Sequence, residues 1–312
     1  MNSFKEIVWT TRNRRGTHPI LAFIVAAFLL AGSFAGLAQT RRTKKSASHS
    51  QPPLSAAERD LVSKAIGVVC TERKTDPKGS IPIDEMQARP SLPVRSPEAI
   101  TGAERAQRLL PMAKTLVIES LNTLAQEYKF SKQYQTRIQQ AIARVEAVSR
   151  IRPDVDARDN ASVFLSRPRT INFGTIFLAG LPSDEGMISV LAHELTHIAD
   201  GDNEILRSLF SAIGNRASEL TGQEIREQRA EELSCDLVGA LAARSFVTNT
   251  PSYEPLPRRI ARSLEHNCVD EDEGDDEHLS PRNTIRALLS LDQSLARELV
   301  SGRYEATRPV RR

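Results

Sequence analysis

Two histidines four residues apart, with a glutamate directly after the first, are the best candidates for chemistry in this chain. They form the stretch His193-Glu194-Leu-Thr-His197. On a helix, residues four apart lie one above the other, so both imidazoles would project from one face. Two such nitrogens suit two positions around a tetrahedral zinc ion, and the glutamate can act as a general base on water at the metal. The spacing predicts a hydrolytic zinc centre with His193 and His197 as ligands and Glu194 as the catalytic residue.

The residues around this stretch predict the helix that it needs. Ser183 is a typical helix-start residue, and the acidic residues Asp184 and Glu185 follow it, where the helix dipole favours anions. Gly201 supplies a stop. Between these ends, apolar residues recur at three- and four-residue spacing: Ile188, Leu191, Leu195 and Ile198. We therefore expect one amphipathic helix that carries the whole motif.

A catalytic zinc ion of this kind needs a third protein ligand, and the best candidate is Glu232. It lies in the stretch Glu232-Leu-Ser-Cys-Asp236. Residues 232 and 236 would share one helical face, so Glu232 can ligate the metal while Asp236 accepts the second ring proton of a zinc-bound histidine. The sequence thus predicts one Zn²⁺ per chain, bound by two histidines and one glutamate.

This set of motifs resembles the HtpX-like and CAAX-prenyl-protease-like gluzincin metallopeptidases, in their soluble periplasmic branch. That family carries H-E-x-x-H followed by E-x-x-A-D on a later helix, and here Cys235 stands in place of the alanine. The departure is mild, because a free cysteine behaves as a small buried residue. The resemblance spans residues 131–300. It implies a zinc endopeptidase that hydrolyses envelope or membrane-associated proteins, in quality control or processing.

Residues upstream of the motif extend the resemblance. Asn160-Ala161, and then the run 174–178, look like the segments that precede the zinc helix in the family. There, a strand edge holds the substrate backbone by strand addition. The resemblance therefore implies substrate contacts at Gly174, Thr175 and Ile176.

The segment after residue 269 holds one further candidate. His278-Leu-Ser-Pro281 is similar to a His-Pro segment that opens a late helix in the family. His278 is thus either a substrate-facing residue of the active site or an ordinary residue at a helix start. The run 270–277 before it carries seven acids in eight positions. Its glycine stands one place too early for a calcium loop, so we expect a solvated acidic loop.

The expected fold class is α+β, mainly α, with a zincin-like metallopeptidase domain. Apolar periodicity predicts helices at residues 56–70, 99–128, 131–151 and 203–247, and another that begins near residue 280. Between residues 160 and 181, β-branched and aromatic residues predict two short strands. These would form a hairpin, or an edge strand, just before the motif helix, from the segments 164–165, 170–173 and 175–178.

The amino-terminal part indicates export. Residues 20–38 contain no charge and follow a basic segment, which is typical of a secretory signal or of a signal-anchor helix. We expect the catalytic part in the periplasm, or anchored to the inner membrane through residues 20–38 with its catalytic part outside the cytoplasm. The expected order is a signal or anchor (1–38), a flexible tether (39–57), a helical and Pro-rich wrap (58–130), the metallopeptidase domain (131–300) and a basic tail (301–312).

Composition narrows the partners. The chain has 312 residues, a net charge of +3 and 5% aromatic residues, and its basic residues cluster toward both ends. Neither a basic face nor a set of stacking aromatics is indicated, which argues against nucleic-acid binding. Polypeptide substrates are the expected partners, and the oligomeric state stays open. If the protein is exported, Cys70 and Cys268 could pair, with two free thiols as the alternative.

Other functions remain compatible with the motif. A factor that keeps the metal but only binds or assembles envelope proteins would not need Glu194. A scaffold with a merely amphipathic helix would need no metal at all. The motif also allows a hydrolase that acts on something other than peptides.

Overall fold

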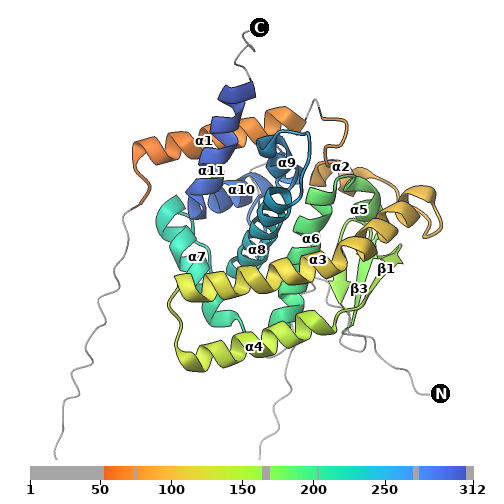
Figure 1. Cartoon of the computed structure of the whole chain (residues 1–312), viewed down its shortest axis with the longest axis horizontal. Helices are drawn as coiled ribbons and strands as arrows, with labels where there is room; N and C mark the ends of the chain where they lie inside the picture. Colours follow the sequence, from red (N-terminus) through yellow and green to blue (C-terminus); the bar gives the residue numbers. More distant parts are fainter. Residues whose placement is uncertain (1–52, 74–75, 164–168, 202–203, 270–273, 307–312) are drawn as a thin grey trace, which may run out of the picture.

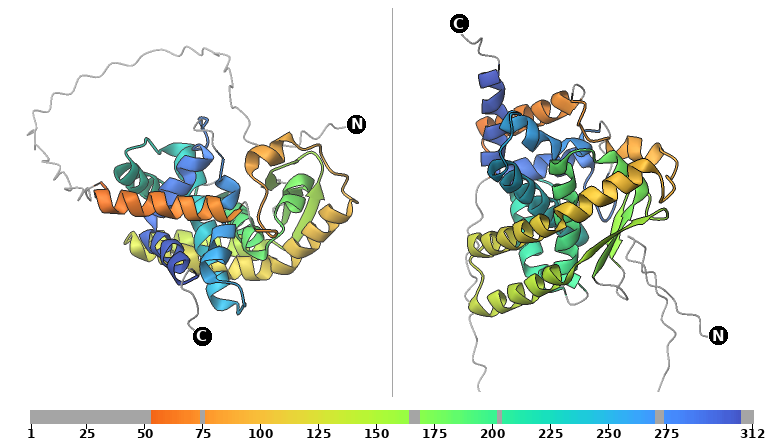
Figure 2. Two further views of the ribbon diagram at one scale, coloured as in Figure 1. Left: turned by 90° about the horizontal axis from the view of Figure 1, so that it is seen from above. Right: turned by 45° about the vertical axis from the view of Figure 1, so that its right-hand side comes forward.

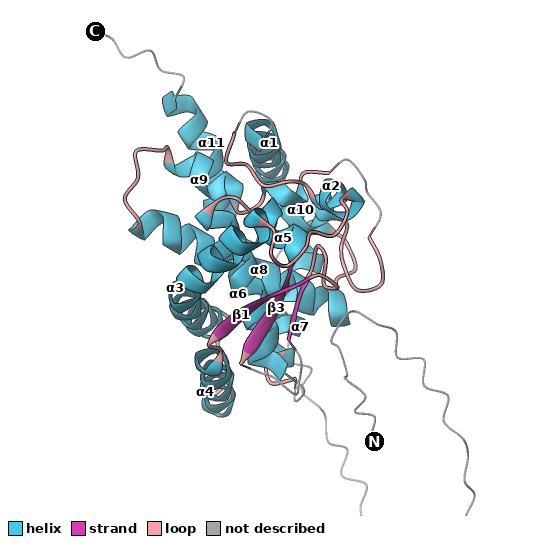
Figure 3. Cartoon of the chain, turned by 90° about the vertical axis from the view of Figure 1, so that its right-hand side faces the viewer, coloured by secondary structure: helices cyan, strands magenta, loops and turns pink. Residues whose placement is uncertain are grey.

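The computed structural model describes residues 53–73, 76–163, 169–201, 204–269 and 274–306. Helices dominate this part of the chain, and a three-stranded sheet lies at one side (Figure 1, Figure 3). The predicted class, α+β and mainly α, is confirmed at that level. The helices are α1 (Ala56–Arg73), α2 (Ile83–Ala88), α3 (Pro97–Glu127), α4 (Lys132–Ala147), α5 (Thr175–Gly180), α6 (Asp184–Asp200), α7 (Arg207–Thr221), α8 (Glu227–Asn249), α9 (Leu256–Arg262), the 3₁₀ helix η2 (Glu265–Asn267), α10 (Pro281–Leu291) and α11 (Gln293–Ala306).

The motif helix α6 lies at the centre of the fold, packed against α3, α4, α8 and α9 (Figure 1). It begins and ends as the sequence predicts. The Ser183 hydroxyl accepts a hydrogen bond from the Gly186 backbone amide at 3.0 Å, which caps the first turn. The helix ends at Gly201, whose φ of 56° is a conformation that favours glycine. Arg144 of α4 donates to the carbonyl of Asp200 at 2.8 Å and so satisfies one of the last carbonyl groups.

Helix α8 approaches α6 closely because it carries a glycine at the contact. A Cβ atom at Gly239 would lie 2.7 Å from the backbone oxygen of Ser189 in α6, which is closer than real Cβ contacts come. The absence of a side chain there lets the two helices pack backbone to backbone. Glu232 lies two turns earlier on α8 and is thereby held beside α6.

The sheet contains one strand that the sequence did not predict. Its order is β1-β3-β2, in which β1 (Arg150–Asp154) runs parallel to β3 (Thr170–Gly174), and β2 (Ala161–Val163) runs antiparallel to β3. The helix expected to reach residue 151 instead ends at Ala147. Strand β3 covers the segment 170–173 that was expected as a strand, but its antiparallel partner β2 is formed by residues 161–163. Phe164 and Leu165, expected in the first strand, lie outside the described residues.

The prediction of a strand at residues 174–178 is wrong. Residues 175–180 form α5, although their β-branched and aromatic side chains favour a strand. The backbone amides of Ile176 and Phe177 both donate to the carbonyl of Arg158, at 3.1 and 3.2 Å, and this contact turns the chain into the helix. Moreover, β3 is the central strand, so it has no free edge to which a substrate strand could add.

The amino-terminal helices share the core of the motif helix. One hydrophobic cluster extends from Leu54 to Leu299, and α3, part of the segment expected to wrap the surface, packs against α6 and α8 within it. Helix α1 lies alongside the carboxy-terminal helices α10 and α11 (Figure 2). The two ends of the described chain therefore stabilise each other.

A disulfide bond and a buried ion pair connect this amino-terminal region to the segment 262–268. Cys70 and Cys268 form a disulfide, so the structure favours the paired alternative. Asp76 and Arg262 are only 2% and 4% exposed, and their side chains meet at 2.6 Å. Burial opposes the charged form of Asp76, but the hydrogen bonds and charge of Arg262 outweigh it and lower the pKa of this carboxyl.

No helix within the described ranges is long and apolar enough to cross a membrane. The candidate signal or anchor (1–38) lies outside the described residues, as do most of the tether and the last six residues of the basic tail.

The disulfide gives the first testable prediction. Replacing both Cys70 and Cys268 with serine should lower the free energy of unfolding by about 2–5 kcal/mol, because the unfolded chain loses a long cross-linked loop. Denaturant unfolding with and without a reductant measures this. The reductant should destabilise the wild type and leave the double variant unchanged; an equal midpoint for reduced and oxidised wild type would contradict the prediction.

Candidate metal centre

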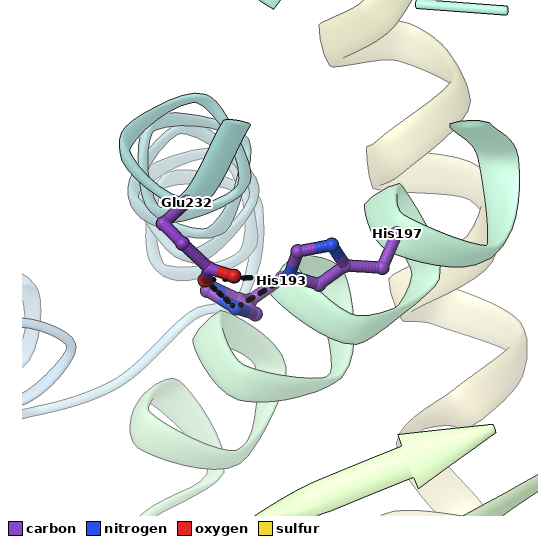
Figure 4. Close-up of side chains that lie close together, drawn as sticks. All are labelled: His193, His197 and Glu232. Atoms are coloured by element: carbon purple, nitrogen blue, oxygen red, sulfur yellow. Dashed lines mark hydrogen bonds and ion pairs between the residues drawn. The ribbon is translucent and has the colours of Figure 1, made fainter. Parts of the chain in front are cut away.

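The three predicted ligands converge at the contact between α6 and α8 (Figure 4). The Nε2 atoms of His193 and His197 lie 3.1 Å apart. Glu232 extends from α8 toward both rings, and its Oε2 lies 3.4 Å from each Nε2 atom. All three donor atoms lie within 4.8 Å of one another. The histidine side chains are 21% and 27% exposed, so solvent reaches the group.

The Nδ1 atom of each histidine ring contacts a carboxylate. Nδ1 of His193 lies 2.8 Å from Oδ1 of Asp236, as the sequence predicts. Nδ1 of His197 lies 3.0 Å from Oε1 of Glu231, a contact that the sequence reasoning missed. The only signal for it was a second acid directly before Glu232. Carboxylates in these positions fix the ring orientation and favour the tautomer with a proton on Nδ1.

This arrangement fits a metal ion. With Nδ1 of both rings bonded to carboxylates, the two Nε2 atoms direct their lone pairs at each other and at the oxygen of Glu232. Three electron-pair donors at such short range repel unless a cation or protons lie between them. Two imidazole nitrogens and one carboxylate oxygen also match the donor set of a three-ligand catalytic zinc site. The described residues can therefore hold a metal ion here.

The electrostatics of the site agree with a bound cation. Burial opposes the charged form of both histidines, but Asp236 and Glu232 near His193, and Cys235, Glu232 and Glu231 near His197, outweigh it. They raise the pKa of both rings well above the ordinary value. Burial likewise opposes ionisation of Glu232, yet the two histidines lower the pKa of its carboxyl well below the usual range. The ligands thus share protons in the place that a cation would take.

Glu194 lies on α6 directly after the first ligand, and it is buried. Burial is the main reason why its pKa is raised, and the nearby charges of Glu232 and Asp236 add to the effect. A raised pKa makes a carboxylate a better proton acceptor. This is the property that the predicted general base requires.

The four histidines of the described chain all gather near this centre. His278 places Nε2 3.6 Å from Oε2 of Glu232, which favours the active-site alternative for this residue. His266 of η2, which no sequence pattern pointed to, is buried, and burial lowers its pKa to about 4 despite the charge of Asp236 nearby. It is thus a neutral neighbour of the centre.

Three of the other candidates lie on β3 and α5, whereas Cys235 interacts with the His197 ring. Thr175 and Ile176 are buried at the start of α5, and Gly174 ends the central strand, so the predicted substrate contacts at these three residues are not supported by the fold. Cys235 is buried, as expected, and burial raises the pKa of its thiol to about 11.

Comparison with known proteins gives no match, since no family model, no curated protein and no solved structure is significantly similar to the chain.

The donor set gives a prediction on metal content. Glu232→Gln should reduce bound zinc from about one ion per chain to a small fraction, because the anionic donor is lost. Asp236→Asn and Glu231→Gln keep all three donors and should weaken zinc affinity by about 10–100-fold. Elemental analysis and competition titration measure both effects. Glu224→Gln, at an exposed position, serves as the matched control. Full zinc in Glu232→Gln would show that another residue completes the site.

The histidine pKa values give a prediction on pH. Because they are raised in the metal-free protein, His193 and His197 hold protons near neutral pH that zinc must displace. Zinc affinity should therefore fall as the pH is lowered from about 8 to about 6, with net proton release on binding. Calorimetric titrations in buffers of different ionisation enthalpy measure this release. An affinity that does not depend on pH would contradict the prediction.

Proposed function

We propose that this protein is a zinc-dependent endopeptidase of the gluzincin type, with a zincin-like domain, that cleaves envelope or membrane-associated proteins. The observation that carries the proposal is the convergence of His193, His197 and Glu232 within 4.8 Å, with Glu194 next to the first of them. The resemblance of these motifs to HtpX-like and CAAX-prenyl-protease-like peptidases supports the same reaction and the same class of substrate.

The residues of the centre divide the chemistry as follows. Zinc bound by the three ligands would polarise a peptide carbonyl and make a coordinated water more acidic. Glu194 takes the proton of the attacking water and then delivers it to the amine of the leaving peptide, which its raised pKa favours. Asp236 and Glu231 keep the ligand rings in place. His278, beside Glu232, contacts the polypeptide where it lies at the metal.

The proposed location is outside the cytoplasm. The Cys70–Cys268 disulfide supports it, because structural disulfides persist in oxidising compartments such as the periplasm and are rare in the cytosol. The uncharged run at residues 20–38 supports it independently, as a removed signal or as a retained membrane anchor. The expected binding of substrate by strand addition at residues 174–178 is not part of this proposal. Residues 175–180 form α5, and β3 is the central strand of the sheet.

The general base provides the test. Glu194→Gln should lower kcat/KM for an unfolded protein substrate by about 10²–10⁴-fold, since it removes the proton acceptor and keeps the shape of the side chain. Proteolysis of casein by the zinc-loaded chain measures this, with a chelated sample as a blank. Zinc content should stay at the wild-type level. Zinc-loaded wild type without hydrolytic activity would instead favour a metal-retaining binding or assembly factor.

A further inference from the structure

The end of the acidic run is attached to the helix that carries Glu232. Residues 274–278 lie beside the first turns of α8, where Arg229 donates from Nε to the backbone oxygen of Asp275 at 2.9 Å. A second guanidinium nitrogen of Arg229 reaches the same oxygen. Arg229 precedes Glu232 by three residues, so both side chains leave neighbouring positions on one face of α8. This part of the run is exposed, as expected for a solvated acidic loop, and its backbone is also bonded to α8.

The carboxylate of Asp275 fixes both the backbone and the ring of His278. Its Oδ1 accepts hydrogen bonds from the backbone amides of Glu277 at 2.8 Å and of His278 at 2.5 Å. The same oxygen lies 3.3 Å from Nδ1 of the His278 ring. Burial opposes the charged form of Asp275, but these hydrogen bonds outweigh it and lower the pKa of the carboxyl. The contact between this carboxylate and the ring lies at the surface, since the Asp275 and His278 side chains are 67% and 45% exposed.

These contacts connect two residues of α8, Arg229 and Glu232, through the loop that carries Asp275 and His278. Arg229 holds Asp275, Asp275 holds Nδ1 of His278, and Nε2 of His278 lies 3.6 Å from the Glu232 carboxylate. The His278 side chain is 45% exposed, so without a fixed partner its ring could adopt several rotamers. With Nδ1 bonded to Asp275, the nitrogen that faces the metal centre is Nε2.

We propose that Asp275, held by Arg229, is a positioning residue that directs Nε2 of His278 at the polypeptide bound at the metal centre. This inference rests on the proposed peptidase function. Both Asp275 and the neighbouring acid Asp276 are exposed, and Asp275 differs in that its Oδ1 contacts the His278 amide and ring. The inference also assigns a role to one acid of the exposed loop that the sequence predicts at residues 270–277.

A purely structural role for Asp275 has to be distinguished from this one. A carboxylate that accepts two backbone amides also stabilises a turn, whatever the ring does. Asp275→Asn keeps an oxygen acceptor for that turn but loses the charge, whereas Asp275→Ala loses both. His278→Ala removes the ring on which Asp275 is proposed to act. Asp276→Ala is the matched control, since it removes an adjacent acid from the same loop.

The kinetic arm is a double-variant cycle on the zinc-loaded full chain, with casein as substrate. Asp275→Ala should lower kcat/KM by about tenfold, Asp275→Asn should lower it less, and Asp276→Ala should leave it unchanged. In the His278→Ala background, Asp275→Ala should have no further effect, because it acts through that ring. Additive losses, or loss of zinc in Asp275→Ala, would overturn the proposal.

The second arm does not depend on catalysis. In the ¹⁵N-histidine-labelled, zinc-loaded chain, NMR under conditions where the ring is neutral should show His278 protonated on Nδ1. Asp275→Ala should shift the ring toward the Nε2-protonated tautomer, and Asp276→Ala should not. A wild-type ring protonated on Nε2, or a tautomer that Asp275→Ala leaves unchanged, would overturn the positioning role. If the wild type cleaves no protein, the peptidase function fails, and this arm alone decides whether Asp275 orients His278.

Discussion

The close packing of α6 against α8 is the contact on which the candidate centre depends. Two of the three donors come from α6 and the third from α8, so the group exists only while these helices keep their distance. Gly239 permits that distance, because any side chain there would meet the backbone of Ser189. The surrounding helices α3, α4, α7 and α9 hold the pair in one apolar core. The relative positions of the three ligands thus depend on helix packing elsewhere in the core.

The same contact concentrates negative charge in a half-buried place. Glu231, Glu232 and Asp236 all direct oxygens at the two histidine rings, and Glu194 is buried beside them. Such a group of acids destabilises a fold unless protons or a cation compensate it. The acidic side chains that orient the ligands therefore also make the metal-free protein dependent on bound protons. The affinity of this site for a metal ion and the stability of the fold are therefore coupled.

Local patterns were sufficient for the motif helix and its ligands, because i, i+4 spacing, a serine cap and a terminal glycine all act within one helix. They failed where distant contacts decide. Residues 175–180 have strand-like side chains, yet the Arg158 carbonyl turns them into α5. Strand β1, with the sequence Arg-Ile-Arg-Pro-Asp, pairs with β3 but has no strand-like pattern of its own. Asp275 and His266 reach the centre only through tertiary structure, and no spacing in the sequence encodes that approach.

The disulfide has a topological consequence for a chain proposed to cleave proteins. Cys70 and Cys268 are 198 residues apart, and all three candidate ligands lie inside the covalent ring that they close. A single cut within that ring, for example in the exposed loop between α8 and α9, would leave both fragments joined through sulfur. The shared core would hold the cut ends near their original positions. A molecule nicked by itself or by a neighbour would therefore remain one particle, with its ligands still in place.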